Sequence, residues 1–329
     1  MQTRRATSVA TANIAFCKYW GNLNDALRLP TSGSLSMNLA GLTTTTTVEF
    51  CDDLIRDDVY IGGEYVTGAA AERVSHHLDH VRQLAGQALY ANVTSENNFP
   101  TGAGIASSAS AFAALSLAAT SAIGLTLSER ELSVLARLGS GSAARSIPSG
   151  FVEWHAADKH EDSYAESFAP PEHWALIDLI AVISRAHKAT GSTEGHAIAA
   201  TSPLQAARLQ SAPTRIAECK RAILERDFPA FATVVELDST VMHAVMMTGA
   251  PPLFYWQPTT LSVMDHVRRW RAEGLAVCYT IDAGANVHCL CLVSDADLIA
   301  ARLLQINGIA EVLRAAPGGP AHLIPQSDS

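Results

Sequence analysis

The stretch NNFPTGAGIASSAS, residues 97–110, decides how this 329-residue chain folds. An asparagine pair leads into a glycine-bearing turn, two serines and a long run of Ala and Leu, which predicts a loop that ends at a helix N-terminus. The free N–H groups and the positive end of the helix dipole suit a nucleotide phosphate. The serine hydroxyls can donate to phosphate or bind a magnesium ion. The same pattern is typical of an ordinary helix cap, so both interpretations stay open for this stretch alone.

Two common nucleotide-binding patterns do not fit this stretch. No Lys-Ser or Lys-Thr pair follows the last glycine, so it is not a Walker A loop. The G-x-G-x-x-G spacing of a dinucleotide-binding turn is also missing. A nucleotide bound here would be held by a phosphate loop of another kind.

Composition limits the class of protein. A chain of this length with 48% hydrophobic residues can bury a large core, which predicts two domains or one two-lobed unit. A formal charge of −9 argues against nucleic acid or an anionic membrane as the main partner. The N-terminal apolar run is too short and too polar for a signal peptide, and no run approaches about 18 apolar residues. We therefore expect a cytoplasmic protein with a small-molecule substrate, no nucleic acid and no membrane.

Cysteines and histidines give no sign of a metal centre. The six cysteines include no C-x-x-C pair, and Cys289 and Cys291 alternate within an apolar run, as on one face of a strand. We expect reduced thiols in the core. His76, His77 and His80 lie on a predicted helix without a carboxylate–histidine signature, so we expect them to be solvated on its exposed face.

The order of the predicted elements indicates an α+β fold. Alternation and helical periodicity predict strands at 8–16, 35–50, 59–66 (a hairpin around Gly62-Gly63), 89–95, 174–184, 275–281 and 287–293. They predict one helix at 69–89 and a second from the end of the 97–110 loop to about Gly124. A third begins at the capping box of Ser128 and Glu131. Several more follow Pro203, and Pro213 is expected to break one of them. We place a boundary near residue 185, between an N-terminal ATP-binding domain (1–185) and a C-terminal domain (186–329).

Three Gly/Ser loops, at 97–110, 139–146 and 188–196, could meet in one site. Arg145 ends the second loop, and its planar fork suits a carboxylate or a phosphate. Lys18 follows an apolar strand, and Asp282 precedes small residues that let a substrate approach. An aspartate beside ATP could accept a hydroxyl proton during phosphoryl transfer. Taken singly, Asp282 is also typical of a turn and Arg145 of a surface ion pair, so the residues alone predict an ATP-using enzyme for a small molecule.

Six segments in a fixed order resemble one known family. They are Asn13-Ile14-Ala15-x-x-Lys18-Tyr19-Trp20-Gly21, Leu29-Pro30-Thr31-x-x-Ser34, 97–110, 139–146, Ser192-Thr193-x-Gly195 and Asp282-Ala283-Gly284-x-Asn286. From about residue 7 to 320, the chain closely resembles the mevalonate diphosphate decarboxylase branch of the GHMP kinase superfamily. The resemblance implies a two-lobed GHMP kinase fold, usually a homodimer, that uses ATP and magnesium. It also implies phosphorylation of the tertiary 3-hydroxyl of a mevalonate phosphate, then loss of phosphate and CO2 to leave an isopentenyl phosphate.

The resemblance further implies roles for individual residues. Asp282 would orient or deprotonate the 3-hydroxyl, and Arg145 would grip the substrate carboxylate. Lys18 would neutralise charge near the transferring phosphoryl group, and Ser108 would orient substrate and γ-phosphate. The implied substrate-binding residues are Tyr19, Trp20, Asn22, Arg73, Ser140, Gly141, Ser142 and His196. The implied ATP-binding residues are Ser95, Asn97, Asn98, Gly102, Ala103, Gly104, Ile105, Ala106, Ser107, Ser108, Ser110, Lys188 and Ser192, with Ser107 also binding magnesium.

Departures from the family pattern bear on the substrate. The family's second lysine, a ligand for the terminal phosphate, is Asn22 here, Leu23 replaces a basic residue, and His196 replaces a methionine. Losing one cation from a diphosphate site removes a contact worth roughly 1.5–3 kcal/mol, or ten- to hundredfold in affinity. We therefore predict mevalonate 5-phosphate as the substrate, with the 5-diphosphate as the alternative. A mevalonate 3-kinase without decarboxylation and a non-catalytic ATP-binding relative are further alternatives, which separate assays of ADP and CO2 would distinguish.

Overall fold

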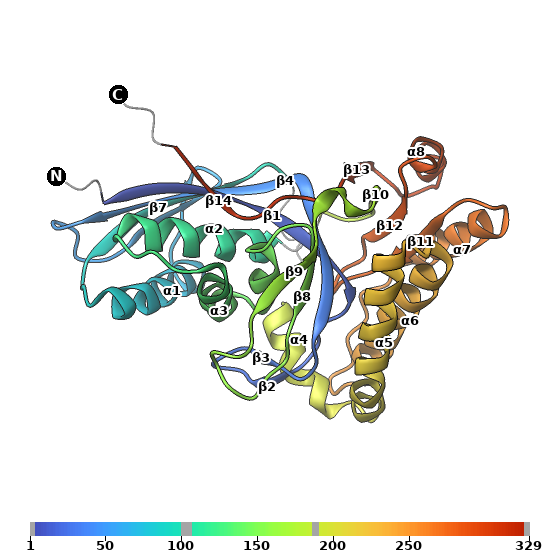
Figure 1. Ribbon diagram of the computed structural model, residues 1–329, viewed down its shortest axis with the longest axis horizontal. Helices are drawn as coiled ribbons and strands as arrows, with labels where there is room; N and C mark the ends of the chain where they lie inside the picture. Colours follow the sequence, from blue (N-terminus) through green and yellow to red (C-terminus); the bar gives the residue numbers. More distant parts are fainter. Residues whose placement is uncertain (1–3, 100–106, 186–190, 326–329) are drawn as a thin grey trace.

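The computed structural model describes residues 4–99, 107–185 and 191–325. Within these ranges the chain forms two lobes, each built on a β-sheet with helices against it (Figure 1). The N-terminal strands and the first helices make one lobe, and the helix-rich second half of the chain makes most of the other. The predicted two-lobed α+β architecture is confirmed.

The first sheet is organised around one long strand, β4. In the described residues the sheet has the order β14-β1-β4-β7-β5-β6, with β8 beside β4 and β9 beside β8. Its strands are β1 (Arg5–Cys17), β4 (Ser34–Cys51), β5 (Asp58–Ile61), β6 (Glu64–Tyr65), β7 (Tyr90–Asn97), β8 (Phe151–Trp154), β9 (Ala165–Ala169) and β14 (His322–Ile324). The beginning of β4 pairs with β8, its second half pairs with β7, and β1 runs antiparallel along most of its length. The predicted strand 35–50 is thus confirmed, as is the hairpin at Gly62-Gly63.

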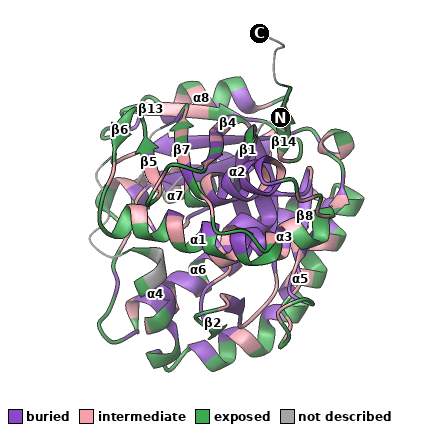
Figure 2. Cartoon of the chain, turned by 90° about the vertical axis from the view of Figure 1, so that its left-hand side faces the viewer, coloured by how far each residue is buried: buried purple, intermediate pink, exposed green. Residues whose placement is uncertain are grey.

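One face of this sheet is covered by α1 (Ala69–Ala85), α2 (Ser107–Ala122) and α3 (Glu129–Gly139). Small residues make α2 almost entirely buried, so it lies directly on β1 and β4 (Figure 2). The predicted capping box starts α3: the Glu131 N–H donates to the Ser128 hydroxyl, and the Glu131 carboxylate accepts the Ser128 N–H at 2.8 Å. A 3-10 turn, η1 (Gly141–Ser146), follows α3 and carries the second Gly/Ser loop.

The second sheet has the order β11-β12-β10-β13 in the described part of the chain. Its strands are β10 (Leu176–Val182), β11 (Val277–Thr280), β12 (Val287–Leu292) and β13 (Glu311–Ala315). The helices of this half are α4 (Ser192–Ile198), α5 (Gln205–Glu225), α6 (Phe228–Met247), α7 (Pro258–Ala272) and α8 (Ala296–Leu303). The short elements are β2 (Asn22–Asn24), β3 (Leu29–Pro30), η2 (Pro171–His173) and η3 (Ala199–Thr201). Every residue of β10 is buried, because side chains of the second half cover one face of the sheet and the shared core covers the other.

The chain passes between the two sheets at more than one place. β10 lies before residue 185 but pairs with β12 and β13 of the second sheet. At the other end, β14 returns to the first sheet and pairs with β1. The division into domains at residue 185 stays a prediction.

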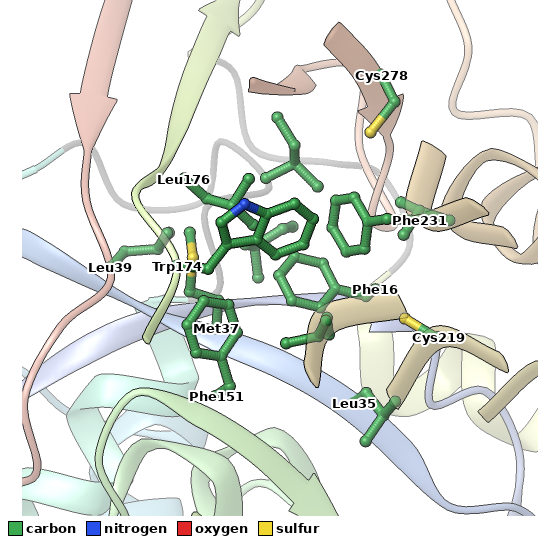
Figure 3. Close-up of a cluster of buried hydrophobic side chains, with 14 of the residues drawn as sticks. Phe16, Leu35, Met37, Leu39, Phe151, Trp174, Leu176, Cys219, Phe231 and Cys278 are labelled. Atoms are coloured by element: carbon green, nitrogen blue, oxygen red, sulfur yellow. The ribbon is translucent and has the colours of Figure 1, made fainter. Parts of the chain in front are cut away.

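A shared core joins the two lobes. Figure 3 shows aromatic, aliphatic and cysteine side chains from β1, β4, β8, β10, α5, α6 and β11 in one cluster. The ring of Phe16 stands edge-on to Phe231 with centroids 5.0 Å apart, and Phe231 contacts Trp174 at 5.2 Å. Because Phe16 comes two residues before Lys18, this packing fixes the end of β1 from which the site is built.

The prediction that Pro213 breaks a helix is wrong. Pro213 lies inside α5, which runs without interruption from Gln205 to Glu225. A proline removes one helical N–H donor and costs a few kcal/mol in isolation. Here the buried face of α5, including Arg208, Arg215 and Cys219, packs against β1 and α6, and this tertiary contact outweighs the local penalty.

The expected exposure of the three α1 histidines is wrong for His77. His76 is exposed and His80 is half-buried, but His77 is 1% exposed and its Nε2 lies 2.8 Å from the Ser116 hydroxyl on α2. The helix turns this one histidine toward its neighbour because residue 77 shares the buried face with Val74, Leu78 and Val81. Burial lowers the pKa of His77 to about 3, so it is neutral.

The expected core thiols are confirmed, with one exception. Cys17, Cys219, Cys278, Cys289 and Cys291 are free and buried, and Cys51 is free and half-buried.

In the described residues, one helix, α6, is long and apolar enough to cross a membrane by length and composition, and 56% of its 18-residue window is buried. Buried Asp238, Ser239 and His243 on α6 instead face the middle of the protein, as befits a core helix.

Candidate active site

Lys18 and Asp282 form an ion pair although 264 positions separate them. Lys18 follows β1 and Asp282 follows β11, and Lys18 Nζ lies 2.5 Å from Asp282 Oδ1. The lysine side chain is 2% exposed, but that of Asp282 is 26% exposed, so the carboxylate keeps an open side. Burial alone would raise the pKa of Asp282, but the charge of Lys18, with those of His288 and Arg145, holds it below its usual value. Asp282 is therefore ionised.

Arg145 lies in η1 as a buried cation, 4% exposed. Its Nε and Nη2 donate to Asn13 Oδ1 at 3.2 and 3.0 Å, and its Nη1 donates to Ser34 Oγ at 2.9 Å. These partners, within the described residues, are neutral. Burial lowers the pKa of Arg145 to about 10, so it stays charged at neutral pH. A buried guanidinium held by neutral groups is suited to binding an anionic group of a substrate.

Asp282 lies within electrostatic reach of both cations. Arg145 helps to lower the pKa of Asp282, and Asp282 in turn opposes the effect of burial on Arg145. An ionised carboxylate with one open side and two cations can orient a hydroxyl group, compensate phosphate charge and bind a carboxylate. The sequence predicted each residue separately, and the fold brings them together.

Serine hydroxyls form a row between α2 and η1. Ser108 Oγ lies 3.1 Å from Ser140 Oγ, which lies 3.3 Å from Ser142 Oγ. Ser107 and Ser108 open α2, whose first turn carries no acidic side chain, so its positive end is not neutralised there. Ser110 differs: it is fully buried, and its hydroxyl lies 2.6 Å from that of Thr44 in β4. Ser110 therefore packs the helix onto the sheet.

The other residues with predicted nucleotide roles lie at the end of β7, at the start of α4 or outside the described residues. Ser95, Asn97 and Asn98 all form hydrogen bonds with residues of β4. The Asn98 amide uses both of its ends, because its Oδ1 accepts the Thr43 N–H and its Nδ2 donates to the Gly41 carbonyl, each at 2.8 Å. Ser192 is the first residue of α4. Gly102, Ala103, Gly104, Ile105, Ala106 and Lys188 lie outside the described residues. The nucleotide roles stay predictions.

Aromatic rings surround the loop that follows Lys18. Tyr19 stacks on His196 with ring centroids 4.0 Å apart and stands edge-on to Trp154 at 4.7 Å. His196 also contacts Trp20 at 4.7 Å, and its Nδ1 accepts the Gly21 N–H at 2.9 Å. Because Nδ1 accepts, the ring proton of a neutral His196 is assigned to Nε2. His196 thus supports the loop that carries Lys18.

Two glycines in this region are required by close packing. A Cβ at Gly141 would lie 2.6 Å from the Tyr19 ring, and one at Gly195 would clash with Trp20. Side chains at these positions would displace the aromatic rings that hold the Lys18 loop. Both glycines belong to the loops that the sequence singled out.

The predicted phosphate-end residues, Asn22 and Arg73, both have partners in the protein. Asn22 Oδ1 accepts the Tyr19 hydroxyl, and its Nδ2 donates to Asp25 Oδ1 at 2.7 Å. Arg73 Nη2 donates to the Gly139 carbonyl at 3.2 Å, directly before Ser140. Arg73 therefore lies beside the row of serine hydroxyls.

Sequence reasoning missed the helix that holds the ion pair in place. Asp238 Oδ1 of α6 accepts the Lys18 N–H at 2.7 Å. Ser239 Oγ accepts the Ile281 N–H at 3.0 Å and donates to the Ile281 carbonyl at 3.3 Å. His243 Nε2 lies 3.3 Å from the same carbonyl. One helix thus fixes the backbone at Lys18 and immediately before Asp282.

Other supporting residues were also missed. Arg208 Nη2 donates to the Lys18 carbonyl at 2.6 Å, and Arg215 Nε binds Asp238 Oδ2 at 2.7 Å. Asn13 and Ser34 lie within segments of the family resemblance, but nothing in their spacing indicated that they hold Arg145. The available signal was the presence of polar residues in otherwise apolar α6, because a buried polar group needs a partner.

The fold and the site together define a class: a two-lobed α+β protein arranged for phosphoryl transfer to a small acidic molecule. Comparisons with known proteins make this more specific. Residues 10–165 match the model of the diphosphomevalonate decarboxylase-like N-terminal domain, and residues 178–317 match that of the mevalonate 5-diphosphate decarboxylase C-terminal domain. The chain belongs to the diphosphomevalonate decarboxylase family, and it is an ATP-dependent carboxy-lyase by family.

Similar proteins cover nearly the whole chain. It is 38% identical to the diphosphomevalonate decarboxylase mvd1 of Aspergillus fumigatus, over 92% of this chain and 81% of the relative, and 39% identical to the human diphosphomevalonate decarboxylase, over 85% and 75%. The crystal structure of mevalonate diphosphate decarboxylase from Staphylococcus aureus matches with a TM-score of 0.92 at 35% identity, over 98% of each chain. A structure of MDDEF in complex with MVAPP, AMPPCP and magnesium also matches at 0.92, with 34% identity, over 98% and 99%. The GHMP kinase fold is thus confirmed.

These comparisons overturn the predicted substrate. The relatives are named diphosphomevalonate decarboxylases, and matching structures hold the diphosphate substrate. The prediction of mevalonate 5-phosphate rested on the departures at Asn22, Leu23 and His196, and chiefly on the cation lost at Asn22. It is therefore wrong, and its stated alternative is the better supported one. The physical error was to count charge at one position rather than over the whole site.

Proposed function

We propose that this protein converts mevalonate 5-diphosphate, with ATP, into isopentenyl diphosphate, ADP, phosphate and CO2. The observation that carries the proposal is the grouping of two buried cations, Lys18 and Arg145, around the partly exposed carboxylate of Asp282. The names and bound ligands of the relatives support the same substrate.

In the first step the 3-hydroxyl oxygen of the substrate forms a bond to the γ-phosphorus of ATP, and ADP leaves. Asp282 orients this hydroxyl and accepts its proton as the new P–O bond forms. Since Lys18 keeps the pKa of Asp282 low, the carboxylate is a weak base, and orientation is its larger contribution. Lys18 compensates the charge of the transferring phosphoryl group.

The residues present fit ATP and magnesium at the beginning of α2. The first turn of this 16-residue helix has no acidic side chain, and Ser107 and Ser108 present hydroxyls there. We infer that Ser107 is a magnesium ligand and that Ser108 orients the γ-phosphate beside the substrate. Bound ATP supplies the phosphoryl group, and magnesium compensates its charge.

In the second step the C3–O bond breaks, phosphate leaves, and the electrons of the carboxylate C–C bond form the alkene as CO2 departs. Arg145 orients the carboxylate, but its charge also stabilises the anion that must become neutral CO2. Orientation by Arg145 is therefore useful when C–O cleavage comes first and leaves a cation-like carbon beside the carboxylate. Asp282 passes the hydroxyl proton to the departing phosphate, and the carboxylate that is ionised again stabilises the same positive charge.

The proposal is tested by incubating the protein with ATP, magnesium and, separately, mevalonate, its 5-phosphate and its 5-diphosphate. Equal ADP and CO2 release with the 5-diphosphate is expected, at the highest kcat/KM of the three. Release of ADP alone would indicate a 3-kinase, and release of neither would indicate a binding protein. A higher kcat/KM for the 5-phosphate would refute the proposed substrate.

We further infer from the family resemblance that the protein is a cytoplasmic homodimer. Light scattering after size-exclusion chromatography tests the oligomeric state, and a monomer at micromolar concentration would contradict it. Cell fractionation tests the location.

A further inference from the structure

Two arginines from distant parts of the chain meet at the end of α3. Arg28 lies in the turn between β2 and β3, and its Nε donates to the Leu138 carbonyl at 2.9 Å. Arg73 of α1 donates to the next carbonyl, that of Gly139, at 3.2 Å. Both guanidinium groups therefore bind the two carbonyls that precede Ser140, the first serine of the 139–146 loop.

Neither arginine is neutralised by the described protein. The ion pairs of the described residues include neither Arg28 nor Arg73, and both are bound through neutral carbonyl groups. Partial desolvation and the charge of Arg28 lower the pKa of Arg73, so the two cations lie near enough to act on each other. Two neighbouring cations that have no ion-pair partner among the described residues favour an anion of more than one negative charge.

Arg28 also acts near position 22, where this chain has asparagine in place of the family's second lysine. It shares the β2–β3 hairpin with Asn22, which pairs with Pro30. Burial raises the pKa of the Tyr19 hydroxyl, and Arg28 gives the largest opposing effect. That hydroxyl donates to Asn22. The charge of Arg28 therefore reaches the same polar groups as a cation at position 22 would.

The backbone at Arg28 is in an unfavourable conformation. Its φ of +49° is in the left-handed region, where residues other than Gly, Asn and Asp are uncommon. The tight turn 25–28 places the side chain toward α3, where it reaches Leu138. Such a conformation at a binding site is a reason to look for function in the side chain.

We propose that Arg28, together with Arg73, binds the terminal phosphate of the 5-diphosphate substrate and replaces the cation that is absent at Asn22. This inference rests on the proposed function. It makes Arg28 a specificity-determining residue, and it explains how a chain without the family's second lysine can use the diphosphate.

The test removes the charge without adding backbone strain. Arg28 is replaced by asparagine because asparagine tolerates the left-handed conformation. The control is Arg226→Asn, because Arg226, at the end of α5, is the other described non-glycine residue with a positive φ (57°). By calorimetry, Arg28→Asn should weaken binding of mevalonate 5-diphosphate 10- to 100-fold. Binding of the 5-phosphate should change less than threefold, and Arg226→Asn should change neither. Arg28→Lys, which keeps the charge without the fork, should give an intermediate loss.

A rescue experiment makes the assignment specific. The double variant with Arg28→Asn and Asn22→Lys should bind the 5-diphosphate at least tenfold more tightly than Arg28→Asn alone, because one cation would replace the other. The inference is overturned by unchanged diphosphate affinity in Arg28→Asn, by equal losses for both substrates, or by a double variant no better than the single one. Failure of the proposed function would appear differently, as a wild-type protein that binds the 5-diphosphate but releases no ADP and CO2.

Discussion

Replacing Ser239 by alanine should slow turnover while leaving substrate binding almost unchanged. The Ser239 hydroxyl is the described partner of the Ile281 N–H, at 3.0 Å, and Ile281 immediately precedes Asp282. Alanine leaves this buried N–H unpaired, which costs about 1–3 kcal/mol. The Ile281 carbonyl keeps a partner, because His243 Nε2 lies 3.3 Å away. The expected result is a displaced backbone beside the catalytic carboxylate rather than an unfolded lobe.

The size of the effect follows from how strongly turnover depends on geometry. A misplacement of about 1 Å in a reacting group can cost about 100-fold in rate. We expect kcat to fall 10- to 100-fold, which corresponds to roughly 1.4–2.7 kcal/mol in activation free energy. KM for ATP and for mevalonate 5-diphosphate should stay within about threefold, since Ser239 lies on the buried face of α6 and has no exposed surface.

The assay measures kcat, both KM values and the melting temperature for Ser239→Ala. Thr233→Ala is the matched control, because Thr233 is an exposed hydroxyl on the same helix that bonds only to its own turn, at Pro229 O, 2.9 Å away. The control should match the wild type in kcat. A Ser239→Ala protein with lowered melting temperature and normal kcat would refute the reasoning, because α6 would then stabilise the fold without positioning Asp282.

Three further predictions concern the charged groups. Asp282→Ala should lower kcat at least about 1,000-fold, about 4 kcal/mol, with an unchanged circular dichroism spectrum; near-normal turnover would remove Asp282 from the mechanism. Arg145→Gln should raise KM for the substrate and lower the CO2 released per ADP, measured in the same reaction, because the carboxylate is no longer oriented; an unchanged ratio would contradict that role. Acid should destabilise the protein through His77 and His243, whose pKa values burial lowers to about 3 and about 4. Between about pH 6.5 and 4 the unfolded chain binds protons that the folded chain does not, so stability falls with falling pH, by about 3 kcal/mol from His243. His77→Gln should flatten the dependence of unfolding free energy on pH, measured by urea titration; an equal slope would contradict this assignment.

Local features of the fold could be predicted from the sequence. The β4 strand follows from its alternating Thr43–Thr47 run, α3 follows from its capping box, and the hairpin follows from Gly62-Gly63. Predictions failed where tertiary contacts outweigh local preference. Pro213 is tolerated because the buried face of α5 is packed, and His77 is buried because a neighbouring helix offers it a hydroxyl.

The site was predictable as separate residues but not as an arrangement. Lys18, Arg145 and Asp282 could be chosen for their chemistry, but no local pattern reports a contact between positions 18 and 282. The supports on α6 were missed because a hydrogen bond to a distant backbone leaves no periodicity in the sequence. Arg28 was missed for a related reason, because its proposed role depends on its position beside Arg73, which no local sequence pattern indicates.

The low pKa of Asp282 bears on which step it assists. A carboxylate held ionised by Lys18 has little tendency to take a proton from an alcohol, so a base role would be weak. The same negative charge is well suited to a cation-like carbon formed when phosphate leaves. Asp282→Asn separates these contributions, because the amide keeps the shape and can still bond to the hydroxyl. If charge in the second step dominates, this variant should release ADP in excess of CO2; an equal fall in both products would place the main contribution of Asp282 in the phosphoryl transfer.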